Sequence, residues 1–251
     1  MPHARAGRPI RNLPRSSVLY RVQKGDRALD WVLVGISAVA GYLLGSFPTG
    51  YLIGRIHRID IRRFGSGRTG GTNVLRTLGW LPALVTAAAD VLKGMAAVWL
   101  AKALGAPPAG HAVAAVCAVL GHNYTFTLKF KGGAGVAPMV GATAALSLPV
   151  AGFLLPIGLA VMAASRYASL GSLTLSALFP MGMAIQWLGH RVPIAYFVAS
   201  LIMSAIVVLA HRPNIRRLLQ GTERKVGQRV EVHNPNNPNE SHPPPDVPCS
   251  R

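Results

Sequence analysis

Acidic side chains are scarce in this 251-residue sequence, which has 8 Asp and Glu against 26 Lys and Arg. Charged residues of both signs make up only 14% of the chain, whereas 51% is hydrophobic, and the mean hydropathy is +0.36. A soluble globule of this length needs more charged residues to cover its surface, so the composition indicates a membrane protein. The formal net charge of +18 predicts anionic partners, such as phospholipid head groups, phosphorylated metabolites or nucleic acid.

Cysteine is also rare, and no stretch of the chain shows the alternating pattern of a strand. Cys117 lies within an apolar run and Cys249 lies near the end of the chain. Two isolated cysteines support neither a disulfide framework nor a cysteine metal site. No cluster of metal ligands is visible in the sequence, and we expect neither a metal nor another cofactor.

The arrangement of the basic residues argues against nucleic acid as the anionic partner. A protein that binds nucleic acid usually presents a basic stripe on one folded face, with aromatic residues between the charges. Here the basic residues lie in short loops between apolar runs. We therefore expect membrane lipids and phosphorylated small molecules as partners, and the sequence leaves the oligomeric state open.

Seven segments are apolar and nearly uncharged, as a helix that crosses the bilayer must be. They cover residues 31–56, 81–104, 110–128, 135–147, 149–165, 169–189 and 194–210. The fourth, fifth and seventh are short for a full crossing. The fold class that we predict is an all-α integral membrane protein, a single bundle of about seven transmembrane helices.

The two ends of the chain differ in composition from this membrane domain. Residues 1–30 form a basic tail, and the C-terminal tail, residues 227–251, is rich in Asn and Pro from residue 230 onward. Neither composition can bury a core, so we expect both tails to be disordered. The membrane domain is predicted to cover residues 31–226.

Lys and Arg in the short loops predict the orientation of the bundle. The loops after the first, third, fifth and seventh segments carry nearly all of these residues, whereas the opposite loops carry only Lys102 and Arg191. Basic loops stay on the cytoplasmic side, which puts these four loops and the C-terminus in the cytoplasm and the N-terminus outside. The basic tail opposes this assignment, since it would have to cross the membrane; a special case, a misassigned start or a segment count wrong by one would each resolve the conflict.

Four polar stretches in these same loops are rich in Gly, Ser, Arg and Asn. They begin at Gly65, His122, Arg166 and His211. Glycine lets backbone amides approach an anion closely, and nearby Arg or Lys side chains neutralise its charge. We therefore predict one phosphate site at the inner membrane surface, built by loops from distant parts of the chain.

One pair of charges lies inside a predicted span. Asp90 and Lys93 are three residues apart, so they share a helix face and can form an ion pair. A proton relay or a transport pathway would require further ionisable residues on other spans. We favour a structural ion pair within the bundle.

The ordered set of motifs is more specific than any single glycine loop. It reads GSFPTGYLIGR from Gly45, GSGRTGGTNVLRTLG from Gly65, DVLKG from Asp90, GHNYTFTLKFKGGAGV from Gly121, RYASLGS from Arg166 and HRPNIRRLLQGTE from His211. Over about residues 31–226 the chain resembles the bacterial acyl-phosphate:glycerol-3-phosphate acyltransferase family, PlsY.

The resemblance implies an enzyme of the bacterial cell membrane that opens phospholipid synthesis. It would move a fatty acyl group from acyl phosphate to glycerol 3-phosphate, giving lysophosphatidic acid and phosphate. The family uses neither acyl-CoA nor acyl carrier protein directly. In agreement, no His is followed by Asp five positions later, so the His-Asp box of other glycerolipid acyltransferases is absent.

Carried onto this sequence, the motifs imply a set of site residues. The predicted catalytic residues are Ser66, Arg76, Ser169, His211 and Asn214; the predicted phosphate-binding residues are Arg68, Thr72, Asn73, His122, Lys131, Gly132, Gly133, Gly135 and Arg217. Taken singly, each has a plainer alternative as a helix cap, a ligand of lipid head groups or a packing residue. The ordered set favours the site.

This sequence departs from the family pattern at two positions that bear on charge. The family usually reads Lys-Gly-Gly-Lys-Gly where this chain has Ala134 in place of the second lysine, and Arg68 stands at a usual Asn. Our hypothesis is that Arg68 supplies the missing cation from the neighbouring glycine loop. The alternatives are a catalytically impaired relative that binds a phosphorylated lipid precursor, and a small anion transporter.

Overall fold

The computed structural model describes residues 27–230, and the regular secondary structure in this range is helical. The long helices are α2 (Arg27–Gly45), α5 (Trp80–Ala103), α6 (Pro108–Asn123), α7 (Val136–Leu146), α8 (Leu148–Ser165), α9 (Ala168–Leu188) and α10 (Ile194–Ala210). The short elements are α3 (Thr49–Ile56), α4 (Gly71–Leu78), α11 (Arg212–Leu219) and the 3-10 turns η1 (Ile61–Arg63) and η2 (Phe126–Leu128). Most of the two predicted tails lies outside the described residues, although α2 begins inside the predicted 1–30 segment.

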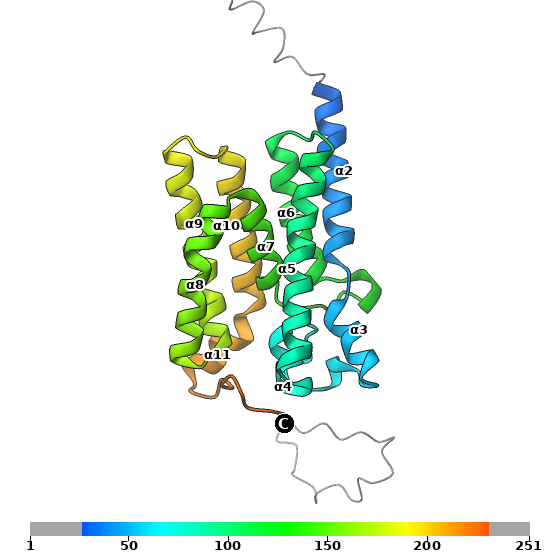
Figure 1. Ribbon diagram of the computed structural model, residues 1–251, viewed down its shortest axis with the longest axis vertical. Helices are drawn as coiled ribbons and strands as arrows, with labels where there is room; N and C mark the ends of the chain where they lie inside the picture. The colour runs from blue at the N-terminus through cyan, green and yellow to red at the C-terminus, as the bar shows by residue number, and fades with distance from the viewer. Residues whose placement is uncertain (1–26, 231–251) are drawn as a thin grey trace, which may run out of the picture.

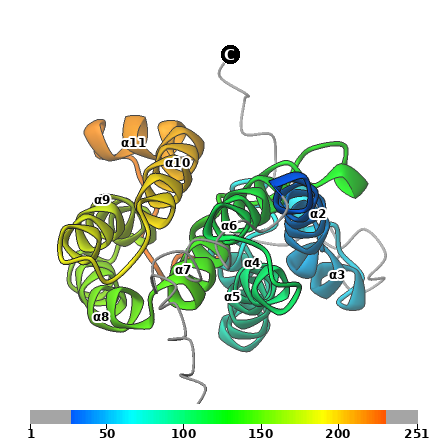
Figure 2. The ribbon, with the colours of Figure 1, turned by 90° about the horizontal axis from the view of Figure 1, so that it is seen from above.

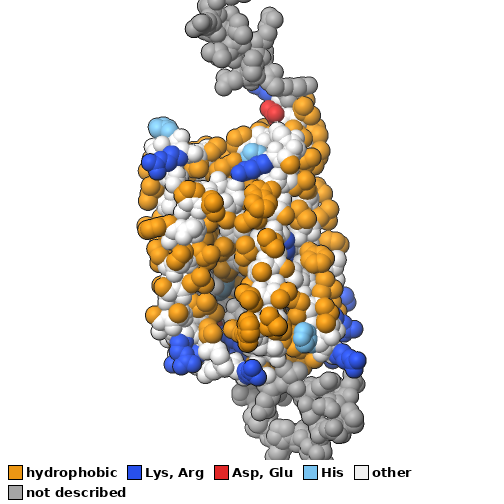
Figure 3. All heavy atoms as spheres, in the orientation of Figure 1, with side chains coloured by type: hydrophobic (Ala, Val, Ile, Leu, Met, Phe, Trp, Pro, Cys, Tyr) orange, Lys and Arg blue, Asp and Glu red, His pale blue; other side chains and the backbone are white. Residues whose placement is uncertain are grey.

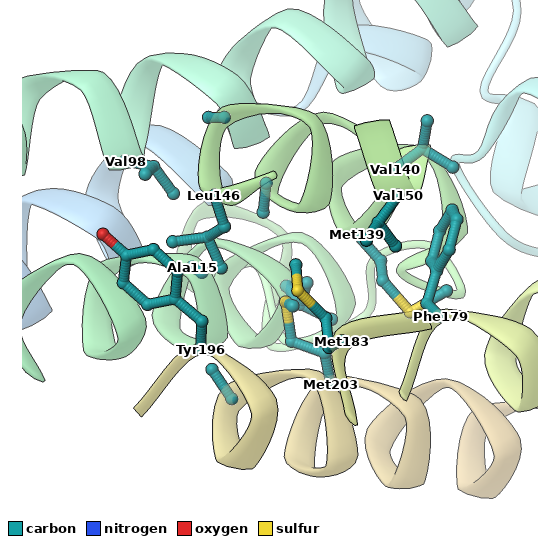
Figure 4. Packing of buried hydrophobic residues seen from close by; sticks show 14 of the residues in the cluster. Val98, Ala115, Met139, Val140, Leu146, Val150, Phe179, Met183, Tyr196 and Met203 are labelled. Atoms are coloured by element: carbon teal, nitrogen blue, oxygen red, sulfur yellow. The ribbon is translucent and has the colours of Figure 1, made fainter. Parts of the chain in front are cut away.

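The long helices run side by side along the long axis of the molecule (Figure 1). Seen along that axis, α8, α9 and α10 form one group and α2, α5 and α6 form the other, with α7 between them (Figure 2). The main core joins the two groups, and Met139, Phe179, Met183 and Met203 are fully buried in it (Figure 4). Short helices α4 and α11 lie at the same end of the bundle (Figure 1).

Glycines let the backbones of neighbouring helices touch. A Cβ atom added to Gly45 of α2 would lie 2.1 Å from the carbonyl oxygen of Ala118 in α6. One added to Gly141 of α7 would lie 1.9 Å from the carbonyl oxygen of Val91 in α5. Small residues at such contacts are typical of helix packing in membranes, where dispersion contacts between backbones replace the hydrophobic effect.

The surface is mainly apolar between the two ends, where the basic side chains gather (Figure 3). Each of the seven predicted spans is occupied by a long helix, so the predicted all-α membrane fold is confirmed. Within residues 27–230, four helical stretches can cross a membrane by length and composition, one of them α2 together with α3; the number is five if α10 and α11 count as one bent span. Helices α6 and α7 are shorter than 18 residues, so the predicted number of seven crossings is not established.

Two predicted spans are longer than the helices that occupy them. The first, 31–56, breaks between α2 and α3, where Pro48 has no N–H and restricts the residue before it. The third, 110–128, ends at Asn123, because the Thr125 hydroxyl bonds the Gly121 carbonyl and the chain turns into η2. The predicted span was too long because η2 contains apolar residues, which continue the apolar pattern of the sequence past the end of α6.

Candidate functional site

The first polar stretch contacts the second stretch and the end of α10, directly before the fourth stretch. The backbone N–H of Thr69 donates to the carbonyl oxygen of Gly132 at 3.4 Å. The guanidinium of Arg68 donates to the carbonyl oxygen of Ala210, at the end of α10. Loops far apart in the sequence therefore meet at one end of the bundle, as the motif analysis predicted.

The loop that leads into α4 is held in shape by one buried amide. The Asn73 Nδ2 donates to the carbonyl oxygens of Ile61, Phe64 and Arg68 at 2.8–3.1 Å, and its Oδ1 accepts the backbone N–H of Ser66 at 2.9 Å. Asn73 is only 2% exposed. Asn73 therefore holds the loop in shape. Ser66 on the loop and Thr72 in the first turn of α4 are exposed.

The glycine turn of the second stretch is clamped against the end of α6. The N–H of Gly132 donates to the Asn123 carbonyl at 3.0 Å, and the N–H of Gly133 donates to the His122 carbonyl at 2.9 Å. A Cβ on Gly133 would lie 2.0 Å from Nε2 of the buried His122 ring. His122 therefore packs beneath the turn, and it does not lie on the exposed side that Lys131 occupies.

The turn ends where α7 begins. Gly135 caps α7 with a φ of 86°, in the left-handed region that favours glycine. The first N–H groups of a helix have no partner within that helix and attract anions. Glycine at position 135 therefore lets the chain turn sharply into α7, and α7 begins next to the glycine turn that contacts Thr69.

The charges predicted inside the second span form a buried ion pair in α5. Lys93 Nζ lies 2.8 Å from Oδ1 of Asp90 and donates to the Phe47 carbonyl, at the break between α2 and α3, at 2.9 Å. His122 Nδ1 lies 3.6 Å from the same carboxylate. The pair joins α5 to the helix break and to α6, which supports the structural role predicted for it.

Glu223 gathers residues from the third and fourth stretches. Its Oε1 accepts from the Ser169 hydroxyl at 3.1 Å and from Asn214 Nδ2 at 2.8 Å. Its Oε2 accepts from Arg217 Nε at 2.7 Å. The carboxylate thereby holds three of the predicted site residues, from α9 and α11, within one cluster.

Burial and hydrogen bonding act on the charge of this cluster in opposite directions. Burial disfavours ionisation of Glu223, but hydrogen bonds from Asn214 and Arg217 outweigh it and hold the pKa of that carboxyl below its usual range. Burial lowers the pKa of Arg68, and the charge of Arg217 lowers it further. Arginine stays protonated at neutral pH even so, and the cluster together with Arg68 carries the positive charges of Arg68 and Arg217 against the one negative charge of Glu223.

Glu223 was not among the predicted site residues, although it ends the last motif. A carboxylate is not an obvious ligand for phosphate, because cations and glycine-rich loops are the residue types that indicate a phosphate site. Its signal in the sequence was its presence in a basic segment of a chain that has 8 acids in all.

Arg76 is buried near the segment 224–230. Its Nη2 donates to the Arg224 carbonyl at 3.2 Å, and its own carbonyl accepts the N–H of Val230 at 3.0 Å. The Nε atom of Arg76 is buried and has no hydrogen-bond partner among the described residues. Burial lowers the pKa of Arg76.

His211 lies at the junction of α10 and α11 and is 5% exposed. Burial lowers its pKa, so the ring is neutral at pH 7. Its Nδ1 lies 2.8 Å from the Val207 carbonyl, which can only accept, so Nδ1 carries the proton. Nε2 is then the ring atom with a lone pair. Within residues 27–230 no three His, Cys, Asp or Glu are grouped to hold a metal ion.

Comparison with known proteins places the described region in one family. The family model for glycerol-3-phosphate acyltransferase matches residues 35–221. Glycerol-3-phosphate acyltransferase 2 of Moorella thermoacetica is 45% identical over 200 residues, which are 79% of this chain and 99% of that protein. Glycerol-3-phosphate acyltransferase of Thermus thermophilus is 44% identical over 192 residues, covering 76% of this chain and 94% of the relative.

Two solved structures share the fold. Crystal structures of PlsY, an integral membrane glycerol 3-phosphate acyltransferase, in its glycerol 3-phosphate and lysophosphatidic acid forms, match with TM-scores of 0.72 and 0.69. Both are 32% identical to this chain; the matches cover 77% and 78% of it and 96% of each PlsY chain. By its sequence and its fold, this chain belongs to the glycerol-3-phosphate acyltransferase family of integral membrane proteins.

Proposed function

We propose that this protein transfers a fatty acyl group from acyl phosphate to the first hydroxyl of glycerol 3-phosphate. The hydroxyl oxygen attacks the acyl carbonyl carbon, the bond from that carbon to the phosphate oxygen breaks, and inorganic phosphate leaves. The products are lysophosphatidic acid and phosphate. The forms in which the PlsY relative was solved support glycerol 3-phosphate as the acceptor.

The chemistry requires the site to hold two anionic phosphates close together. Acyl phosphate is a mixed anhydride with a good leaving group, so positioning and charge stabilisation account for most of the catalysis. Arg68, Arg76 and Arg217 supply cations around the cluster, and Lys131 adds a fourth from the exposed face of the glycine turn. The N–H groups of Val136 and Ala137, at the start of α7, supply donors to oxygens of the substrates; Pro138 has no N–H, and that of Met139 is bonded to Gly135.

The proton of the attacking hydroxyl needs an acceptor near the cluster. A phosphate oxygen of the substrate can take it, so no side-chain nucleophile is required. The neutral His211 has Nε2 available as a second acceptor, because Nδ1 is bonded to the Val207 carbonyl. Asn214 and Ser169 are fixed by Glu223 and orient the substrate around this atom.

The observation that carries this proposal is the junction of loops, in which Glu223 joins the third stretch to the fourth and Arg68 joins the first to the end of α10, directly before the fourth. The test supplies purified protein with acyl phosphate and labelled glycerol 3-phosphate, and with acyl-CoA and acyl carrier protein as control donors. We expect labelled lysophosphatidic acid and equimolar phosphate with acyl phosphate alone. Tight binding without phosphate release would identify a binding protein, and uptake of label into vesicles a transporter.

We also propose that the motif loops and the C-terminal end face the cytoplasm of a bacterial cell. The bias of basic residues toward these loops, against Lys102 and Arg191 opposite, supports this orientation. Single cysteines placed at exposed Gly67 and His190, in a background without Cys117 and Cys249, would test it by labelling of intact cells. Only the second should react with a reagent that cannot cross the membrane.

A further inference from the structure

Helix α11 has two faces with different partners. Asn214 and Arg217 face the Glu223 cluster and bond its carboxylate. Arg212, Ile215, Arg216 and Leu219 recur at the spacing of one helix face and, with Gln220, line a shallow surface hollow of about 370 Å³. This second group is called the outer face of α11 below.

The outer face combines bare apolar surface with positive charge. Leu219 is 85% exposed, and both Arg212 and Arg216 are exposed beside it. The helix contains no acidic residue, and Arg216 has no carboxylate partner among the described residues. In water the exposed leucine would remain solvated. At the boundary between lipid head groups and acyl chains, the leucine can enter the acyl region while the arginines contact phosphates.

The position of α11 places this face at such a boundary. The helix is bent by 58° from α10, and it lies at the rim of the bundle (Figure 2). Leu209, at the end of α10 next to the bend, is 50% exposed, so the apolar surface of α10 continues toward the outer face. Charge and apolar surface thus occur together where a membrane-spanning helix leaves the apolar band.

We propose that the outer face of α11 binds the head group of an anionic membrane phospholipid. Arg212 and Arg216 pair with the phosphate, and Ile215 and Leu219 enter the acyl region beside α10. Each basic residue near an anionic surface strengthens binding about fivefold, so the pair together contributes about 30-fold.

The bound lipid also acts on the site, an effect that rests on the proposed acyltransferase function. Asn214 and Arg217 project from the same short helix, and Thr222 closes its end by donating from its N–H to the Arg217 carbonyl at 2.8 Å. A lipid that fixes α11 fixes both donors to Glu223. Anionic lipid therefore lowers the KM for glycerol 3-phosphate and leaves kcat nearly unchanged.

The binding test needs no enzymatic activity. Leu219→Cys, in a background with Cys117→Ser and Cys249→Ser, is labelled with a fluorophore and placed in nanodiscs with brominated phosphatidylglycerol or brominated phosphatidylcholine. We expect stronger quenching by phosphatidylglycerol, and loss of this preference when Arg212→Gln and Arg216→Gln are added. Arg55→Gln with Arg58→Gln removes an equal exposed charge from the last turn of α3 and the turn after it, and should keep the preference. Equal quenching by both lipids, or a preference that survives the α11 changes, overturns the proposal; quenching by neither lipid points to a soluble acidic partner and also overturns it.

The kinetic test uses nanodiscs of phosphatidylcholine with and without about one third phosphatidylglycerol. We expect the KM for glycerol 3-phosphate to fall about threefold with the anionic lipid in the natural protein and in the Arg55/Arg58 variant. The Arg212/Arg216 variant should keep the higher KM in both lipids, and a response equal to that of the natural protein would overturn the coupling. If no sample forms lysophosphatidic acid, the proposed function fails, and the quenching result still decides head-group binding.

Discussion

The loops around the first two polar stretches and the cluster of the last two are built by different means. Asn73 and the carbonyls of His122 and Asn123 hold the first two through contacts with backbone atoms and through close approach at glycines. Glu223 holds the last two through side-chain hydrogen bonds and one ion pair. Shape therefore sets the first region and charge sets the second, and the two should respond to different perturbations.

Gly132→Ala should produce the largest effect, because it breaks the region set by shape. The added Cβ would lie 2.0 Å from the His122 carbonyl oxygen, which is backbone and cannot move away cheaply. Overpacking of this kind costs about 1–3 kcal/mol, and here the strain falls on the turn itself. We expect kcat/KM for glycerol 3-phosphate to fall about 100-fold or more at every pH, as measured by phosphate release.

Gly70→Ala is the matched control for that change. Gly70 precedes α4 in the first stretch at a φ of −78°, and an added Cβ would meet nothing within 4 Å. Its kcat/KM should stay within about twofold of the natural value. Equal losses in the two variants would show that close packing of the turn is not what matters.

Glu223→Gln should produce the next largest effect, since it removes the charge that organises the second region. Glutamine keeps the shape but carries no charge. One of its two terminal atoms is an NH₂ group, so it cannot accept from Arg217 on one side and from Asn214 and Ser169 on the other, as the carboxylate does. We expect about a 30-fold loss of kcat/KM at pH 7. Asp60→Asn, which removes a partly buried pair with Arg62 in the loop after α3, should lose less than about threefold.

The pH dependence of stability gives the same variant a second readout. Because the pKa of Glu223 is lower in the folded protein than in the unfolded chain, its stabilising contribution is complete above the usual glutamate value. That contribution is lost as the pH falls through the lowered pKa. The melting temperature of the natural protein should therefore drop more steeply below about pH 4 than that of Glu223→Gln. Parallel melting curves would contradict the ionised carboxylate.

Arg68 connects the two regions, and its removal should produce an intermediate effect. Its neighbour Thr69 bonds the glycine turn that contains Ala134, and its own guanidinium reaches the end of α10. We expect Arg68→Ala to lose about tenfold in kcat/KM, and Arg68→Ala with Ala134→Lys to recover most of it. Full activity in Arg68→Ala would refute the idea that Arg68 replaces the missing lysine.

Hydropathy predicted the helices of the bundle because lipid imposes a strong pattern on any helix that faces it. The predicted segment 194–210 coincides with α10, because Pro193 directly precedes the apolar run and His211 directly follows it. The break at Pro48 and the early end of α6 were missed, because apolar residues continue past both. Helices α3, α4 and α11 are too short to register in a window set by membrane thickness.

The motifs predict a set of site residues, but they do not predict which contacts each residue makes. Asn73 and His122 were predicted to bind phosphate, yet the structure buries both beneath loop backbone. Which face of a loop a side chain takes depends on tertiary contacts that motif spacing does not encode. Glu223 was missed because a carboxylate is not an obvious ligand for phosphate, and its bonds to Ser169 of α9 and Asn214 of α11 exist only in the folded chain.

Deletions at the C-terminal end should give the smallest effects and separate the cluster from the segment that follows it. Removing 224–251 leaves Glu223 in place but takes away the Arg224 carbonyl and the Val230 N–H that bond Arg76. Arg76 keeps its charge and its place in α4, so we expect only a three- to fivefold rise in KM for glycerol 3-phosphate, on the order of one hydrogen bond. Removing 231–251 keeps both contacts and should change neither KM nor kcat. If the shorter deletion costs as much as the longer one, then residues beyond Val230 act on the site and the segment 224–230 is not what orients Arg76.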